Sequence, residues 1–203
     1  MRANNMIRRR YRNRDVQRGV ASVELAMVVG ILFTIILGVL EVARAIYLVN
    51  TLQEVTRRVA AGAATADFRD TAKMGAIRTA AIFRNSPGEL PLGAPISDAH
   101  ILIDYLAQTR AADGDLALSP IAPSNLPASP ARNKETCMAD PHDTCCIRFV
   151  RVRICALGSS TTCEPVPYQT LVSLVSLPFN LPRSTTVVPA ESLGFVLGTP
   201  PSE

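Results

Sequence analysis

The chain has 203 residues, a formal net charge of +4, five cysteines and no tryptophan, which suits one ordinary domain or a small domain with appendages. The positive charge is confined to one end. The first 18 residues hold seven arginines, whereas residues 19–203 carry 14 basic and 16 acidic side chains. A basic arm is compatible with nucleic-acid binding, but the apolar stretch that follows it indicates a membrane protein, so we expect no nucleic-acid partner.

The apolar stretch near the N-terminus predicts a transmembrane helix. Between Val20 and Leu40 the only charged residue is Glu24, and this length covers about 30 Å of helix, one hydrocarbon thickness. The stretch exceeds the core of a secretory signal peptide and lacks the small-residue cleavage site that follows such a core. Because positive flanks stay in the cytoplasm, we expect a single-pass inner-membrane protein with residues 1–19 in the cytoplasm and the C-terminal part in the periplasm or outside the cell.

The helical pattern continues beyond the apolar stretch. Apolar and small residues recur every three or four positions from Val42 to Ala63, and Glu41 with Arg44 has the spacing of a surface ion pair. The sequence therefore predicts one helix over 20–66, with its first half in lipid and its second half amphipathic. Five small residues spaced by four form a candidate face for packing against other helices: Ser22, Ala26, Gly30, Thr34 and Gly38.

The order of these features resembles a known export signal. A basic arm, Gly19, four residues and then Glu24 in an apolar helix are similar to the class III signal of the type IV pilin superfamily. The stretch RGVASVELAMVVGILFTIILGVLEVARAIYLVNTLQEVTRRVAAGAA resembles the TadE-like minor pseudopilins of the tight-adherence (Flp) pilus system. This resemblance implies that a prepilin peptidase cuts between Gly19 and Val20.

The same resemblance implies a role for the glutamate and a set of partners. After cleavage Glu24 would be the fifth residue, and it would pair with the free amino terminus of a neighbouring subunit, which compensates its charge in lipid. The implied partners are the membrane, the peptidase, other pilins or pseudopilins and the pilus assembly platform. The main competing hypothesis is an uncleaved signal-anchor protein with an exported, partner-binding domain.

The remainder of the chain predicts a small sheet domain. Residues 67–110 are expected to hold a break, a short helix over 71–84 and one strand, and residues 111–135, with four prolines, are expected to be a linker. The strand pattern of alternating or β-branched residues occurs in four segments: 100–106, 145–155, 168–177 and 185–188. The predicted fold class is α+β, a long N-terminal helix followed by a small, mostly antiparallel sheet.

All five cysteines lie in the last region, 136–203: Cys137, Cys145, Cys146, Cys155 and Cys163. In an exported domain such cysteines favour disulfides. Cys155 and Cys163 flank a turn and are expected to pair, and Cys137 is expected to pair with Cys145 or Cys146. Because five is odd, at least one thiol remains over or bonds another chain.

Two alternatives use the same residues. Cys137, His142, Cys145 and Cys146 offer thiolate and imidazole ligands to zinc, but their spacing matches no common zinc pattern, so we expect no metal and no cofactor. An exported cysteine enzyme using His142 is the other alternative. Neither His142 nor His100 has an evident nucleophile and carboxylate around it in the sequence, so we assign no catalytic residue and expect a non-enzymatic protein.

Overall fold

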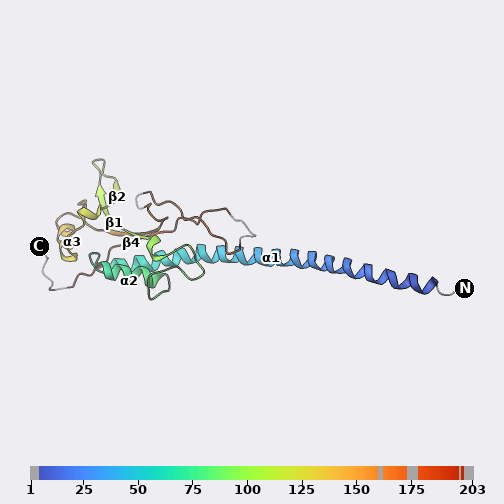
Figure 1. Cartoon of the computed structure of the whole chain (residues 1–203). Coiled ribbons are helices and arrows are strands. Elements are labelled where there is room, and N and C mark those ends of the chain that lie inside the picture. Colours follow the sequence, from blue (N-terminus) through green and yellow to red (C-terminus); the bar gives the residue numbers. More distant parts are fainter. Residues whose placement is uncertain (1–4, 160–161, 173–177, 197, 199–203) are drawn as a thin grey trace. The chain divides into compact units, whose positions relative to one another are not determined.

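The structure is a computed structural model that describes residues 5–159, 162–172, 178–196 and 198. The chain divides into two compact units, Met1–Ala45 with Thr170–Ser176 and Ile46–Gln169 with Leu177–Glu203. The described elements follow in chain order as α1 (Asn5–Thr65), α2 (Thr71–Ala81), η1 (Asp98–His100), β1 (Ile101–Arg110), β2 (Leu116–Pro120), η2 (Pro123–Asn125), α3 (Pro130–Ala139), β3 (Phe149–Ile154) and β4 (Thr185–Pro189) (Figure 1). The fold class is α+β, as predicted.

Helix α1 begins earlier than predicted, at Asn5 instead of Val20, and ends at Thr65, close to the predicted end. No proline occurs before residue 87 and no glycine before Gly19, and arginine is a good helix former, so the basic arm continues the helix. From Gly19 to Ile36 every residue is exposed. The stretch Gly19–Thr65 holds a segment with a mean hydropathy of 2.6, long and apolar enough to cross a membrane.

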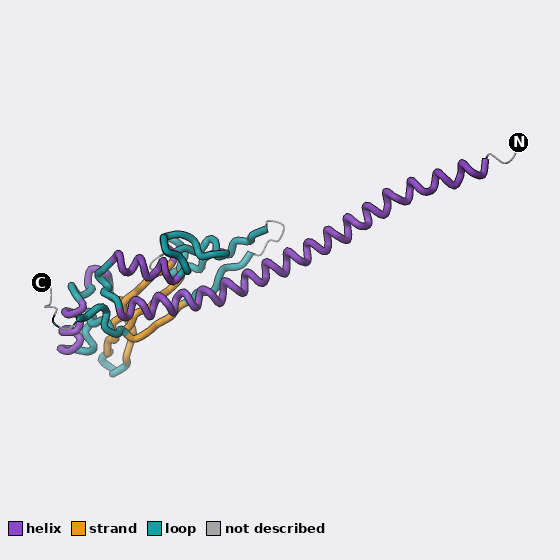
Figure 2. The backbone as a smooth tube through the Cα atoms, turned by 90° about the horizontal axis from the view of Figure 1, so that it is seen from below, coloured by secondary structure: helices purple, strands orange, loops and turns teal. Residues whose placement is uncertain are grey.

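In the second unit α1 becomes a core helix. Leu48, Leu52, Val55 and Val59 are fully buried, and the predicted apolar stripe lies in the core from Leu52 onward. A Cβ on Gly62 would lie 3.0 Å from Cγ2 of Ile77 in α2, so this position requires a glycine or a shift of Ile77. Thr56 Oγ1 of α1 lies 2.9 Å from Thr186 Oγ1 of β4, and Figure 2 shows this part of α1 beside both α2 and the strands.

The sheet has four antiparallel strands in the order β2-β1-β3-β4. Central strand β3 alternates: Val150 and Val152 are fully buried, whereas Arg151 and Arg153 donate from Nε to Oδ2 of Asp104 on β1 at 3.0 and 2.7 Å. This period of two is the pattern that predicted the strand. The strands predicted within 100–106, 145–155 and 185–188 are confirmed as β1, β3 and β4.

Two segments differ from the prediction. The expected linker 111–135 contains strand β2, which pairs with β1, and the first turns of α3. The prolines do not prevent this because Pro120 ends β2 and Pro130 occupies the first turn of α3, where no backbone N–H is needed. The strand predicted over 168–177 is wrong for residues 168–172, which form no strand; residues 173–177 lie outside the described part of the chain.

Two disulfides close short loops in the second unit. Cys155 pairs with Cys163, as predicted, and Cys137 pairs with Cys146 rather than with Cys145. The sequence separations are 8 and 9 residues, and closing loops of this size stabilises a fold by about 2–3 kcal/mol each in the chain-entropy account. Cys145 remains a thiol.

This pairing predicts a definite thiol count. Alkylation of the denatured protein without reductant is expected to add one group, at Cys145, and alkylation after reduction is expected to add five, measured by intact mass. The control is Cys145→Ser, which is expected to add none before reduction and four after it. Three or more groups on the unreduced wild-type protein would contradict the two disulfides.

Candidate functional site

The residues predicted to direct processing and assembly lie on the exposed part of α1 in the first unit. A Cβ on Gly19 would have no atom within 4 Å, Val20 is 57% exposed, and Glu24 is exposed as well. Residues 20 and 24 are one helical turn apart, about 6 Å along the axis. If Val20 became the first residue, its ammonium group and the Glu24 carboxylate would therefore lie near the same end of the helix.

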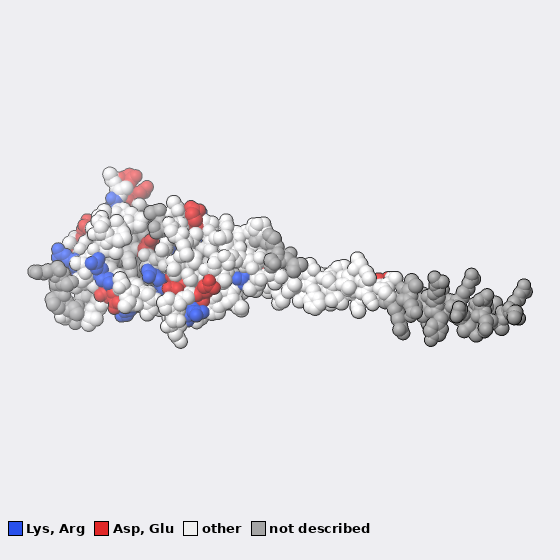
Figure 3. Space-filling model, in the orientation of Figure 1, with Lys and Arg blue, Asp and Glu red and all other residues white. Residues whose placement is uncertain are grey.

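The surroundings of Glu24 on α1 are almost entirely apolar. From Gly19 to Leu40 it is the only charged residue, and Figure 3 shows this stretch of α1 as a surface almost free of charged side chains. A carboxylate inside a bilayer costs on the order of 2.5–3.5 kcal/mol at the centre and less near the interface. Its position therefore requires a compensating partner or a location at the membrane boundary.

The small-residue face is also exposed. A Cβ added to Gly30 or to Gly38 would have no atom within 4 Å, so no contact described within the chain requires a glycine there. Glycine inside a helix costs about 0.5–1 kcal/mol relative to alanine. Thr34 satisfies its own hydroxyl by donating to the Gly30 carbonyl at 2.9 Å. The face thus consists of glycine, alanine and short hydroxyl side chains, a composition that favours close approach of a second helix in lipid.

Glu41 behaves differently from the surface ion pair that its spacing predicts. Glu41 is 2% exposed and Arg44 is 8% exposed, and Arg44 Nη1 lies 3.5 Å from Glu41 Oε1. The backbone N–H of Leu171 donates to both carboxylate oxygens at 3.2 Å. Sequence reasoning missed this contact because its partner lies 130 residues away. The one signal in the sequence is the long uncharged run around Leu171, which predicts a strand and not this contact.

The cysteines and the histidine that were candidate zinc ligands lie in a loop closed by a disulfide. Cys137 and Cys146 form a disulfide, so two of the thiolates that a zinc site would need are oxidised. His142 Nδ1 lies 3.2 Å from the Gln108 carbonyl of β1, and among the described residues no group of three or more potential ligands gathers in metal-binding geometry. Asp143 accepts the Cys145 N–H at 2.6 Å, which holds the turn before β3.

His100 has a local structural partner. Its ring Nδ1 accepts the Ser97 N–H at 3.1 Å and lies 2.9 Å from Ser97 Oγ. Burial lowers the pKa of His100 below its ordinary value, and the negative charges of Asp98 and Glu89 oppose this shift only in part. The neutral ring caps the short η1 helix directly before β1, which is a structural role.

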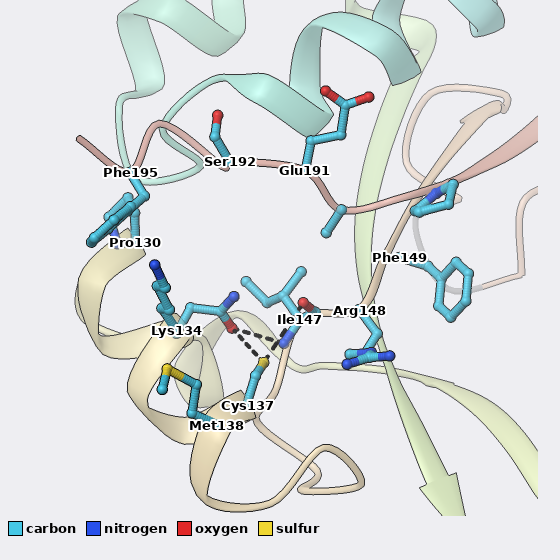
Figure 4. Close-up of a pocket in the computed structure, with 13 residues that line it drawn as sticks. Pro130, Lys134, Cys137, Met138, Ile147, Arg148, Phe149, Glu191, Ser192 and Phe195 are labelled. Carbon is cyan, nitrogen blue, oxygen red and sulfur yellow. Dashed lines mark hydrogen bonds between the residues drawn. The ribbon is translucent and has the colours of Figure 1, made fainter. Parts of the chain in front are cut away.

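A groove borders α3 in the second unit. It has a volume of about 580 Å³. Figure 4 shows Cys137 of α3 near Ile147, Glu191 and Ser192 on the opposite side, and Phe195 beside Pro130 and Lys134. Lys134 Nζ lies 4.3 Å from the Phe195 ring centroid, a cation–π contact. Asn133 accepts the Ile147 N–H at 2.8 Å, so together with the Cys137–Cys146 disulfide it fixes α3 beside the start of β3.

The comparison with protein families found one match in the exposed helix and its continuation. Residues 19–61 match the family model described as TadE-like protein. The matched stretch begins at Gly19, the residue that precedes the predicted cleavage point, and it includes Glu24, the small-residue face and Glu41. The searches of curated proteins and of solved structures found no match.

Proposed function

Because residues 19–61 form a TadE-like protein domain, we propose that this chain is a minor pseudopilin that takes part in assembly of a tight-adherence (Flp) type IV pilus for surface attachment or secretion. Its class III-type signal is processed after Gly19. The observation that carries the proposal is that the family match begins at Gly19 and continues along a helix whose residues 19–36 are exposed. The protein is structural and non-enzymatic.

In this proposal α1 crosses the inner membrane once. The seven arginines before Gly19 keep the leader in the cytoplasm, so the prepilin peptidase cuts on that side and residues from 67 onward lie in the periplasm or outside the cell. Cleavage removes the leader and makes Val20 the free N-terminus.

Assembly then uses two features of the mature helix. Glu24 pairs with the free ammonium group of a neighbouring pilin or pseudopilin, which compensates a carboxylate that lipid disfavours. The face of Ser22, Ala26, Gly30, Thr34 and Gly38 packs against a neighbouring helix. Both surfaces are exposed on the chain described here, apart from Gly38, which is partly covered.

The mature N-terminus tests this proposal directly. In cells that contain the prepilin peptidase, the membrane-bound protein is expected to begin at Val20, and in cells without it the arginine arm is expected to stay attached; intact mass and N-terminal sequencing distinguish the two forms. The variant Gly19→Val is expected to abolish cleavage because the bulky side chain occupies the position before the cut.

A matched control is Gly30→Val on the same helix. Both glycines have open space around the added Cβ, so the two substitutions perturb the helix alike and differ in their distance from the cleavage point. Gly30→Val is expected to be cleaved normally. An intact arginine arm on the wild-type protein in peptidase-containing cells would support the uncleaved signal-anchor protein instead.

A further inference from the structure

A second segment of the chain meets α1 where its apolar stretch ends. Glu41 directly follows the uncharged run to Leu40, is 2% exposed, and accepts the Leu171 N–H on both carboxylate oxygens at 3.2 Å. Residues 170–172 therefore belong to the first unit together with this part of α1. If Val20–Leu40 spans the bilayer, the Leu171 backbone lies at the level of the membrane boundary.

The segment around Leu171 is suited to that level by composition. No charged residue occurs between Glu164 and Arg183, and the Leu171 side chain is 64% exposed. On α1 the neighbours of Glu41 are similarly exposed, with Leu40 at 59% and Val42 at 53%. Exposed apolar side chains therefore occur on both of the segments that the Leu171–Glu41 hydrogen bonds join, directly after the apolar stretch of α1.

The buried Glu41 carboxylate allows the backbone at Leu171 to lie where water is excluded. A backbone N–H without a partner is costly where water is excluded, and Glu41 supplies that partner to Leu171. Arg44, 3.5 Å from Glu41 Oε1, offsets the charge of the carboxylate. Glu41 thus acts as a positioning residue for the segment.

We propose that the segment at Leu171 is a second membrane contact, whose apolar side chains enter the headgroup and acyl boundary of the bilayer beside α1. The occupant of this surface is lipid, because the two segments meet directly where the apolar stretch of α1 ends and carry exposed apolar side chains there. This inference rests on the proposed membrane span of α1, and the experiment below separates the two.

The absence of tryptophan from the chain makes a direct test available. In vesicles of phosphatidylcholine, the full-length variant Leu171→Trp has one indole. With lipids whose acyl chains are brominated near the headgroup, its fluorescence is expected to fall at least twofold relative to unbrominated lipids. Phe33→Trp, 57% exposed within the apolar stretch, is the positive control and is expected to be quenched by lipids brominated deeper in the chain.

The aqueous reference is Leu118→Trp on β2, which is 49% exposed and follows a turn that contains Asp113 and Asp115. It is expected to be quenched by iodide and not by brominated lipid. If Phe33→Trp is quenched and Leu171→Trp is not, the second contact is overturned and the membrane span stands. If Phe33→Trp is not quenched either, the membrane span itself fails. Shielding of Leu171→Trp from iodide without quenching by lipid would indicate that the side chain packs against this chain or a second copy of it, and would also overturn the proposal.

A double variant tests the positioning role of Glu41. Combining Leu171→Trp with Glu41→Ala removes the acceptor of the Leu171 N–H and is expected to lose at least half of the quenching by brominated lipid. Phe33→Trp combined with Glu41→Ala is expected to remain fully quenched, which shows that the helix is still inserted. Unchanged quenching in the first double variant would exclude a positioning role for Glu41.

Discussion

Replacing Glu24 with alanine is expected to abolish piliation while leaving the protein in the membrane. Insertion survives because removing a carboxylate from an apolar helix lowers the cost of entering lipid, by up to about 3 kcal/mol at the bilayer centre. Assembly fails because breaking a buried charge pair typically costs about 3–5 kcal/mol, which is at least 100-fold in an association constant. Counting fibres by electron microscopy and quantifying the protein in membrane fractions measure the two effects separately.

The charge-retaining variant Glu24→Asp is the control for this prediction. Aspartate keeps the carboxylate on a side chain one methylene shorter, so it is expected to retain part of the assembly that alanine loses. Normal fibres in cells that carry only Glu24→Ala would remove the role that we propose for this residue. Loss of the alanine variant from the membrane fraction would show instead that Glu24 serves insertion.

The elements that the sequence predicts well are those whose pattern is local. The continuous apolar run and the stripe after it predict α1, and the alternation of Val150 and Val152 with arginines predicts β3. The processing role of Gly19 and the assembly role of Glu24 rest on the resemblance to pilin signals and stay predictions. None of these inferences requires knowledge of which distant segment packs against the helix or the strand.

The predictions are wrong where local sequence signals conflict or where an element is defined only by its tertiary contacts. Strand β2 is mostly exposed and contains Pro120, so it lacks the alternation of a half-buried strand, and only its pairing with β1 defines it. Helix α3 has a local start signal, with Ser129 Oγ accepting the Arg132 N–H at 3.2 Å and Pro130 in the first turn. The linker prediction treats every proline as a break in secondary structure, although proline is favoured in the first turn of a helix.

The burial of Glu41 illustrates the remaining limit. Its spacing from Arg44 is that of many exposed pairs, and the contact that buries it comes from Leu171, 130 residues later. Glu54 forms a comparable pair with Arg58 one position further along, at 2.7 Å, yet both of those side chains are nearly half exposed. Two pairs of glutamate and arginine on one helix, three and four residues apart, therefore differ in burial because a distant segment covers only one of them.

This difference predicts the outcome of the same substitution at two positions. Glu41→Ala is expected to weaken the attachment of the Leu171 backbone by about 3 kcal/mol, because it removes the acceptor of a part-buried N–H and the carboxylate beside a buried guanidinium. Glu54→Ala is expected to cost about 0.5 kcal/mol or less, since exposed pairs contribute little. Hydrogen exchange of the Leu171 amide in detergent micelles measures the effect, and an increase in rate on the order of 100-fold is expected for Glu41→Ala alone.

The paired design also assigns the cause. Both substitutions place alanine, the best helix former, in α1, so a change in helix propensity is common to the two and cancels in the comparison. A rate increase restricted to Glu41→Ala therefore reports the hydrogen bonds from Leu171 to the carboxylate. Equal exchange rates in the two variants would show that other contacts hold the segment at Leu171. Glu41 would then be buried by the packing of that segment without contributing to its attachment.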